Sequence, residues 1–275
     1  MGSVLIIGPQ KVSMGLTKKF KQLGIRSYTA TTENYLDTNT ITIKTDIFSL
    51  SKSNLPQVSM VYYFPSEPSN RKPAPAQYRK AYFHSLNHLL SIIPSSTKVV
   101  LGSSDHVYGN QYGATADENT PLNIDASDSI PNTILAAENL LRSGPNPHTI
   151  LRLGYIYSDG SVFLNQILKN KIGFSQRQHI VNFIHIDDLV SACITLLAKT
   201  GTYIVSDYQP TPLNTVLSMI SSKTGIAVCP PRKQIPCTRG IRLSPAKLLS
   251  LGFTFKHPSF TFSFQTKSHS EPISN

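Results

Sequence analysis

Residues 103–109, SSDHVYG, place side chains close together in the sequence that could exchange a proton with a substrate. Ser104 offers a hydroxyl, His106 an imidazole that titrates near neutral pH, and Tyr108 a phenol. The segment closes the apolar run KVVLGSS, so we place it at the end of a strand. Because neighbouring side chains on a strand point to opposite faces, we expect that Ser104, Asp105 and His106 do not form a triad. His106 and Tyr108 are therefore candidates for a single acid or base.

A second candidate site is GPQKVSMG, residues 8–15, which leaves an apolar run and enters a helical pattern. A loop that holds a dinucleotide phosphate needs glycines for a tight turn, for close approach of the backbone and for helix packing. Gly8 and Gly15 can serve the first and third purposes, but no glycine stands between them. Lys11 adds positive charge where the helix amides favour a phosphate. The alternative, a plain connection between two elements, stays open.

Both sites need a framework, and the sequence favours a parallel sheet with helices on both faces. Strand-like apolar runs alternate with helical patterns through the first half of the chain, which is typical of α/β proteins. The expected strands are 3–7, 27–31, 40–44, 60–64, 98–104 and 149–157. The expected helices are 14–23, 76–93, 133–141, 213–220 and 244–251. The segment NFIHIDDLVSACITLLA predicts a short strand, an N-cap at Asp187 and a further helix.

Composition excludes several classes of protein. The chain has 275 residues and 40% hydrophobic residues, enough to bury a full core. No apolar run reaches the roughly 20 residues that span a bilayer, so we expect a cytoplasmic protein with no membrane partner. The sparse cysteines, Cys193, Cys229 and Cys237, fit a reducing compartment and match no zinc signature, so we assign no metal. The net charge of +11 raises nucleic acid as a partner, but the basic residues are scattered along the chain.

Five segments together resemble the extended short-chain dehydrogenase/reductase family, the NAD-dependent epimerase/dehydratases. They are VVLGSSDHVYG, ENTP, AAENLL, LRLGYIY and NFIHIDDLVSA, in that order along nearly the whole chain. The resemblance is to small bacterial members, which also carry a segment similar to GIRLSPAKLLSLGF. It implies a Rossmann-type doubly wound parallel sheet in residues 1–158. It also implies a small C-terminal α+β substrate lobe in residues 159–275, interleaved with the sheet around 182–206.

The resemblance also implies roles for individual residues. Ser104 stands where the family has a catalytic Ser or Thr that hydrogen-bonds the substrate oxygen. Asp46 matches a position beside the adenine of the cofactor, although an aspartate after a strand is equally a turn former. The other positions assigned to the cofactor are Gly8, Lys11, Gly15 and Ser103.

The family's proton relay, Tyr-x-x-x-Lys, is missing. Alignment on AAENLL puts Ile130 at the tyrosine position and Ile134 at the lysine position. The chain has no tyrosine in residues 113–154 and no lysine in residues 99–168, so no shift of the alignment restores the pair. Isoleucine has no titratable proton, so the usual acid–base chemistry is absent.

Three functions stay open. The first is an NAD(P)-binding, epimerase/dehydratase-like protein, atypical or non-catalytic, that binds a nucleotide or nucleotide-sugar-like small molecule. The second is an active NADP-dependent reductase or epimerase in which His106 or Tyr108 replaces the missing acid. The third is a basic scaffold whose partner is a nucleic acid or a larger assembly. The cofactor is NADP or NAD, or is lost; the absence of an acidic residue at 29–32 leans toward NADP. The family resemblance suggests a homodimer.

Overall fold

A seven-stranded parallel sheet forms the centre of the molecule, in the order β11-β7-β5-β4-β1-β2-β3. The computed structural model describes residues 2–33, 37–66, 74–122, 124–125, 129–158, 179–224 and 240–260. The strands of the sheet are β1 (Val4–Ile7), β2 (Ser27–Thr31), β3 (Ile41–Lys44), β4 (Met60–Tyr63), β5 (Lys98–Ser104), β7 (His148–Leu153) and β11 (Gly201–Val205). The strand order reverses at β1, so the predicted Rossmann-type doubly wound α/β fold is confirmed.

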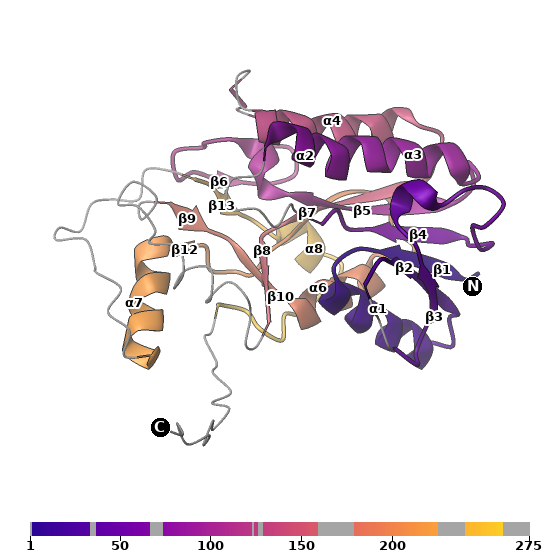
Figure 1. The fold of residues 1–275 in the computed structure, drawn as a ribbon. Helices are drawn as coiled ribbons and strands as arrows, with labels where there is room; N and C mark the ends of the chain where they lie inside the picture. Colours follow the sequence, from indigo (N-terminus) through magenta and orange to yellow (C-terminus); the bar gives the residue numbers. More distant parts are fainter. Residues whose placement is uncertain are drawn as a thin grey trace, which may run out of the picture.

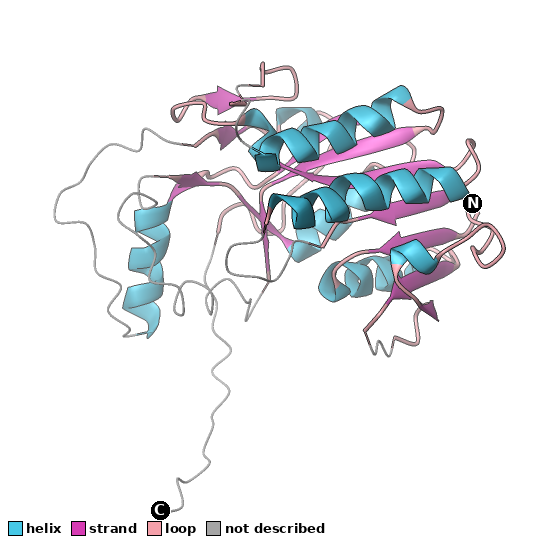
Figure 2. Ribbon diagram, turned by 45° about the horizontal axis from the view of Figure 1, so that its top comes forward, coloured by secondary structure: helices cyan, strands magenta, loops and turns pink. Residues whose placement is uncertain are grey.

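Helices cover both faces of the sheet (Figure 1). One face carries α2 (Pro75–Tyr78), the π-helical segment η2 (Arg79–His84), α3 (Ser85–Ile92) and α4 (Ser129–Ser143). The other face carries α1 (Gln10–Gln22) and α6 (Ile186–Thr195). Figure 2 looks onto the first of these faces, with the long helices in front of the strands. Strands covered on both sides lose the alternation of polar and apolar residues, which explains the wholly buried run VLII in β1.

Two apolar cores result, one on each side of the sheet. On the α1 side, Leu16 and Phe20 pack against residues of β1 and β4, and the rings of Phe20 and Tyr62 lie 5.4 Å apart. On the other side, Leu86 of α3 and Leu141 of α4 pack against the opposite faces of the same strands. Alternate residues of β1 and β4 therefore serve different cores, and this fixes the register of these strands.

The remaining strands are short and lie beyond the carboxyl ends of the main sheet. Parallel β8 (Tyr155–Tyr157) and β10 (Phe183–His185) form one pair, antiparallel β9 (Ile180–Val181) and β12 (Thr211–Pro212) a second, and parallel β6 (Thr115–Ala116) and β13 (Arg242–Leu243) a third. The short helices and turns are η1 (Ile47–Ser49), η3 (Asp105–Tyr108) and α8 (Ala246–Leu249). Helix α7 (Leu213–Thr224) stands away from the sheet and packs on an aromatic core of its own with Tyr157, Phe183 and Phe260 (Figure 1).

Several expected elements have different bounds, and two of these differences bear on the candidate sites. Helix α1 begins at Gln10, directly after Pro9, whereas the sequence placed its start at Met14; the connection from β1 is therefore short. The expected strand over 149–157 is interrupted at Gly154 and becomes β7 and β8. A Cβ at Gly154 would lie 2.9 Å from the carbonyl of Asn182, so the break brings two backbones close together.

A third correction concerns the start of α6. The sequence predicted Asp187 as the N-cap, but the cap is His185, whose Nδ1 accepts a hydrogen bond of 3.2 Å from the amide of Asp187. Asp187 lies in the first turn instead, where its negative charge interacts favourably with the positive end of the helix dipole. Among the described helices, none is both long enough and apolar enough to cross a membrane.

Candidate functional site

Ser104, Asp105 and His106 come together at the carboxyl end of β5, although side chains of a continuing strand would point in different directions. Ser104 Oγ and His106 Nδ1 share a hydrogen bond of 2.7 Å, and Asp105 Oδ1 lies 3.4 Å from the same nitrogen. Because both contacts use the same ring nitrogen, the three residues do not form a triad, as expected; they lie close together because the chain stops being a strand after Ser104 and turns into the 3-10 helix η3. The hydroxyl of Ser104 also caps η3 by accepting the amide hydrogen of His106 at 3.3 Å. The imidazole is exposed, so a bound molecule can reach it.

Asn182 holds this turn against the C-terminal part of the chain. Its amide nitrogen donates to Asp105 Oδ2 at 3.1 Å and to the carbonyl of Ile241 at 3.1 Å. Its amide oxygen accepts from the amide of Leu243 at 2.9 Å. Asn182 is buried, and all these contacts fix its orientation. Sequence reasoning did not single out this residue; the signal was an asparagine ahead of the apolar run FIHI.

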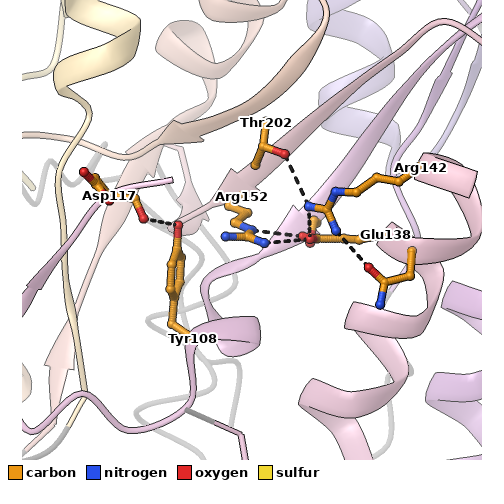
Figure 3. A network of polar contacts seen from close by, with 8 residues as sticks. Tyr108, Asp117, Glu138, Arg142, Arg152 and Thr202 are labelled. Carbon is orange, nitrogen blue, oxygen red and sulfur yellow. Dashed lines mark hydrogen bonds and ion pairs between the residues drawn. The ribbon is translucent and has the colours of Figure 1, made fainter. Parts of the chain in front are cut away.

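Tyr108 has a structural position. Its side chain is fully buried, and its hydroxyl donates to the carbonyl of Asp117 at 2.8 Å. The guanidinium of Arg152 lies over the ring, 4.8 Å from its centre (Figure 3). Burial raises the pKa of Tyr108 to about 12, although the hydrogen bond and charge of Arg152 oppose the rise. Tyr108 therefore does not suit proton exchange near neutral pH, and of the two candidates only His106 has an exposed side chain.

Ser103 contacts the buried carboxylate of Glu138, whose partners Arg142 and Arg152 are shown in Figure 3. Its hydroxyl donates to Glu138 Oε1 at 2.5 Å, and Arg152 and Arg142 each reach Glu138 Oε2, at 2.8 and 2.7 Å. Burial alone would raise the pKa of Glu138, but the hydrogen bonds and charges of its partners, led by Arg152, lower it below the usual value. Glu138 is thus an ionised carboxylate inside the protein, and Ser103 is one of its hydrogen-bond donors.

The two isoleucines that replace the relay lie on α4. Ile134 is buried in the core between α4 and the sheet, and Ile130 packs against the same core. Helix α4 packs against η3, the turn that carries His106. The helix therefore presents apolar side chains at the two positions where the family resemblance implies a tyrosine and a lysine.

The start of α1 lies at the point where the strand order reverses. Ligands of open α/β sheets bind outside the carboxyl ends of the strands at such a point, here between β1 and β4. Pro9 is the N-cap and offers no side-chain acceptor to the first amides of α1, so these amides are suited to an anion. Lys11 stands in this first turn, and its Nζ donates to Ser158 Oγ at 2.9 Å. Lys11 thereby connects α1 with the residue that follows β8.

The two glycines of this segment are explained by packing. A Cβ at Gly8 would lie 2.8 Å from the Cβ of Phe64, the residue that follows β4. A Cβ at Gly15 would lie 2.6 Å from Val190 Cγ2, where α1 crosses α6. Gly8 and Gly15 thus permit close approach of neighbouring elements. For Gly15 this is the packing role that the sequence predicted. For Gly8 it is a packing role in addition to the predicted turn.

Asp46 caps the short helix η1. Its carboxylate accepts from the amides of Phe48, at 2.7 Å, and Ser49, at 3.3 Å. The turn-forming alternative for Asp46 is therefore present in the structure, and its contact with an adenine stays a prediction. Cys229 and Cys237 lie outside the described residues, whereas Cys193 is a buried free thiol in α6.

No protein-family model matches the sequence, and no curated protein matches it. Solved structures do match, over nearly the whole chain. One of them is a Methylobacillus flagellatus protein that is described as an NAD-dependent epimerase/dehydratase. It is 23% identical to this chain, with a TM-score of 0.74 and 94% of each chain covered. The chain has the fold of the NAD-dependent epimerases and dehydratases. The predicted resemblance is thereby confirmed at the level of the fold.

Two further neighbours of this epimerase/dehydratase fold were solved with ligands. MoeE5 in complex with UDP-glucuronic acid and NAD is 20% identical, with a TM-score of 0.72, covering 92% of this chain and 93% of that one. The UDP-glucose 4-epimerase of Thermus thermophilus, solved in complex with NAD, is 16% identical, with a TM-score of 0.69, covering 92% and 94%. These ligands belong to those proteins, and such low identities carry the fold alone.

Proposed function

We propose that the protein binds NAD(P) together with a nucleotide or nucleotide-sugar-like molecule, and that it does so without the Tyr–Lys proton relay. The observation that carries the proposal is the start of α1: uncapped first-turn amides and Lys11 at the switch point of an epimerase/dehydratase fold. Neighbours of the same fold were solved with NAD and UDP-sugars. We propose that the protein is cytoplasmic. The homodimer that the family resemblance suggests stays a prediction.

Ile130 and Ile134 make this member of the fold atypical. Both side chains pack into an apolar core beside η3, and neither can give or take a proton. In the favoured form of the proposal the site binds its ligands without the family's redox chemistry.

Thermal melting with NADPH, NADH and their oxidised forms tests the binding. A ligand at about 100 times its Kd stabilises the folded state by about 2.7 kcal/mol, so occupancy raises the melting temperature. Lys11→Gln should weaken cofactor binding about fivefold to tenfold, since one charge-assisted contact to a phosphate is lost. Lys18→Gln, an exposed lysine of the same helix, is the matched control. No shift with any of the four forms at millimolar concentration would refute the proposal.

The Ser104–His106 hydrogen bond favours a second candidate, an active reductase or epimerase. An imidazole 2.7 Å from a hydroxyl at the end of β5 can pass a proton through that hydroxyl to a bound substrate oxygen. Turnover of UDP-sugars with added cofactor should then fall at least 100-fold in His106→Ala. The exposed His84 gives the control His84→Ala. Equal rates in wild type and His106→Ala would exclude this role for His106.

A further inference from the structure

Two histidines and an aspartate meet at the start of α6, outside the site described above. His185 ends β10, Asp187 lies in the first turn of α6, and His257 belongs to the C-terminal segment. His185 Nδ1 lies 4.0 Å from Asp187 Oδ2, and His257 Nε2 lies 3.7 Å from the same oxygen. One donor atom from each of the three residues falls within 4.8 Å of the other two. The β10–α6 junction and the C-terminal segment thus direct three metal-ligating atoms to one point.

The surrounding structure holds this cluster in place. The amides of Lys256 and His257 both donate to the carboxylate of Asp188, each at 2.8 Å, which anchors the C-terminal segment on α6. Asp188 itself is buried. The rings of His185 and His257 lie 3.6 Å apart with planes inclined by 33°. The contacts to Asp188 keep the C-terminal segment beside α6, so bringing the three residues together costs little entropy, whereas the two stacked rings have to open for one cation to lie in both ring planes.

His257 gives a second, independent indication of a ligand. Its Nε2 atom is buried, and within the described part of the chain it has no hydrogen-bond partner. A buried imidazole nitrogen normally makes a hydrogen bond or binds a metal, because leaving it unsatisfied costs free energy. Asp187 Oδ2 lies 3.7 Å from this nitrogen, a distance that is too long for a hydrogen bond but suits two ligands of one cation.

We propose that His185, Asp187 and His257 bind a divalent transition-metal cation, with Zn²⁺ as the best match. Two imidazoles and one carboxylate form a donor set that Zn²⁺ accepts, with bonds of about 2.0–2.1 Å and a fourth position left open. Tetrahedral bonds of that length place the ligand atoms roughly 3.4 Å apart. The two observed separations, 4.0 and 3.7 Å, therefore need to shorten by less than about 1 Å.

Two existing contacts compete with the cation. The ammonium of Lys256 lies 2.9 Å from Asp187 Oδ2, and the amide of Asp187 donates to His185 Nδ1. The Lys256 side chain is 71% exposed, so it can turn into solvent when a cation takes its place. The amide hydrogen bond, at 3.2 Å, is long and is given up when Nδ1 becomes a ligand. Removing Lys256 should therefore strengthen metal binding.

Calorimetric titration of the EDTA-treated full chain with ZnCl₂ tests the site. A Cys229→Ser, Cys237→Ser background is used, because thiolates bind Zn²⁺ on their own. We expect one Zn²⁺ per chain, at least tenfold weaker binding in His257→Ala, and at least threefold tighter binding in Lys256→Met. His84→Ala, an exposed histidine elsewhere, should bind as the background does.

Co²⁺ in place of Zn²⁺ gives a spectroscopic readout, since tetrahedral coordination produces intense visible absorption that His257→Ala should lose. Should His257→Ala fail to fold, Lys256→Met decides, because it removes only an exposed side chain. The proposal is overturned if the Cys229→Ser, Cys237→Ser background does not bind Zn²⁺, or if Lys256→Met leaves the affinity for Zn²⁺ unchanged. The test does not depend on NAD(P) binding, so its failure leaves the proposed function untouched.

Discussion

Ser104 Oγ and His106 Nδ1 share a hydrogen bond of 2.7 Å although only one residue separates them. In a continuing strand, residues i and i+2 stand on the same face nearly 7 Å apart at about 3.3 Å per residue, so their side chains would have to lean toward each other along the strand. The contact arises here because η3 begins at Asp105 and folds the backbone back on the hydroxyl. The acid–base potential of SSDHVYG thus depends on where β5 ends.

Replacement of Glu138 by Gln should destabilise the protein by about 3–5 kcal/mol, because Arg152 then stays buried without a countercharge. Arg142 is the control: its side chain is 33% exposed, so Arg142→Met should cost at most about 1 kcal/mol. Urea unfolding followed by circular dichroism measures both. Equal losses of unfolding free energy in the two variants would contradict the view that the buried Glu138–Arg152 ion pair contributes more to stability than the exposed Arg142.

Asp207 should make stability depend on pH. Burial raises the pKa of this carboxyl to about 7, two backbone amides oppose the rise, and Asp188 adds to it. The folded state therefore holds the proton more tightly than the unfolded state, whose pKa is near 3.8. The stability contribution is complete below about pH 4 and is lost as the pH rises through 7, by up to about 4 kcal/mol.

Asp207→Asn tests this pH dependence. The amide keeps an acceptor for Gln209 and carries no charge, so the loss of stability between pH 4 and 8 should shrink. Chemical unfolding at a series of pH values gives the comparison. Parallel pH profiles of wild type and variant would show that another group titrates.

Gly15→Ala should destabilise the protein by about 1–3 kcal/mol, since the new methyl would meet Val190 on α6. The cost comes from overpacking and not from helix propensity, because alanine is the better helix former. Val190→Ala removes the opposing methyls, so the double variant should be more stable than the sum of the single losses predicts. Additive effects in this double-mutant cycle would mean that the two helices can simply move apart.

Asn182→Asp should destabilise the protein more than Asn182→Ala at neutral pH. Alanine leaves the amide of Leu243 and the carbonyl of Ile241 unsatisfied, which costs about 1–3 kcal/mol for each buried group. Aspartate keeps the acceptor but places a second carboxylate near Asp105. Thermal melting at pH 7 and at pH 4 should show that the difference between the variants narrows in acid.

The sequence predicted the sheet well because its strands are continuous apolar runs that differ sharply from the helical patterns between them. KVVLGSS, residues 98–104, is an example in which strand and prediction coincide. Local turns were harder. The start of α1 and the cap of α6 depend on backbone geometry that Pro9 and His185 adopt, and no periodicity reports it.

The candidate site was predictable in its location but not in its contacts. Ser103 and Ser104 are neighbours with the same side chain, yet one donates to buried Glu138 and the other reaches exposed His106. Which face each serine occupies follows from the sheet, and what it meets there follows from how the chain folds around it. Asn182 was missed for the same reason, since its partners lie at 105, 241 and 243.

The side-chain amide of Asn182 connects two segments that are far apart in the sequence. One planar group joins the turn after β5 to β13, so a displacement of β13 changes the hydrogen bonding of Asp105 and with it the environment of His106. This link runs past the carboxyl end of β5 and does not involve the apolar cores on the two faces of the sheet. The NMR signals of the His106 ring should accordingly change when β13 is displaced.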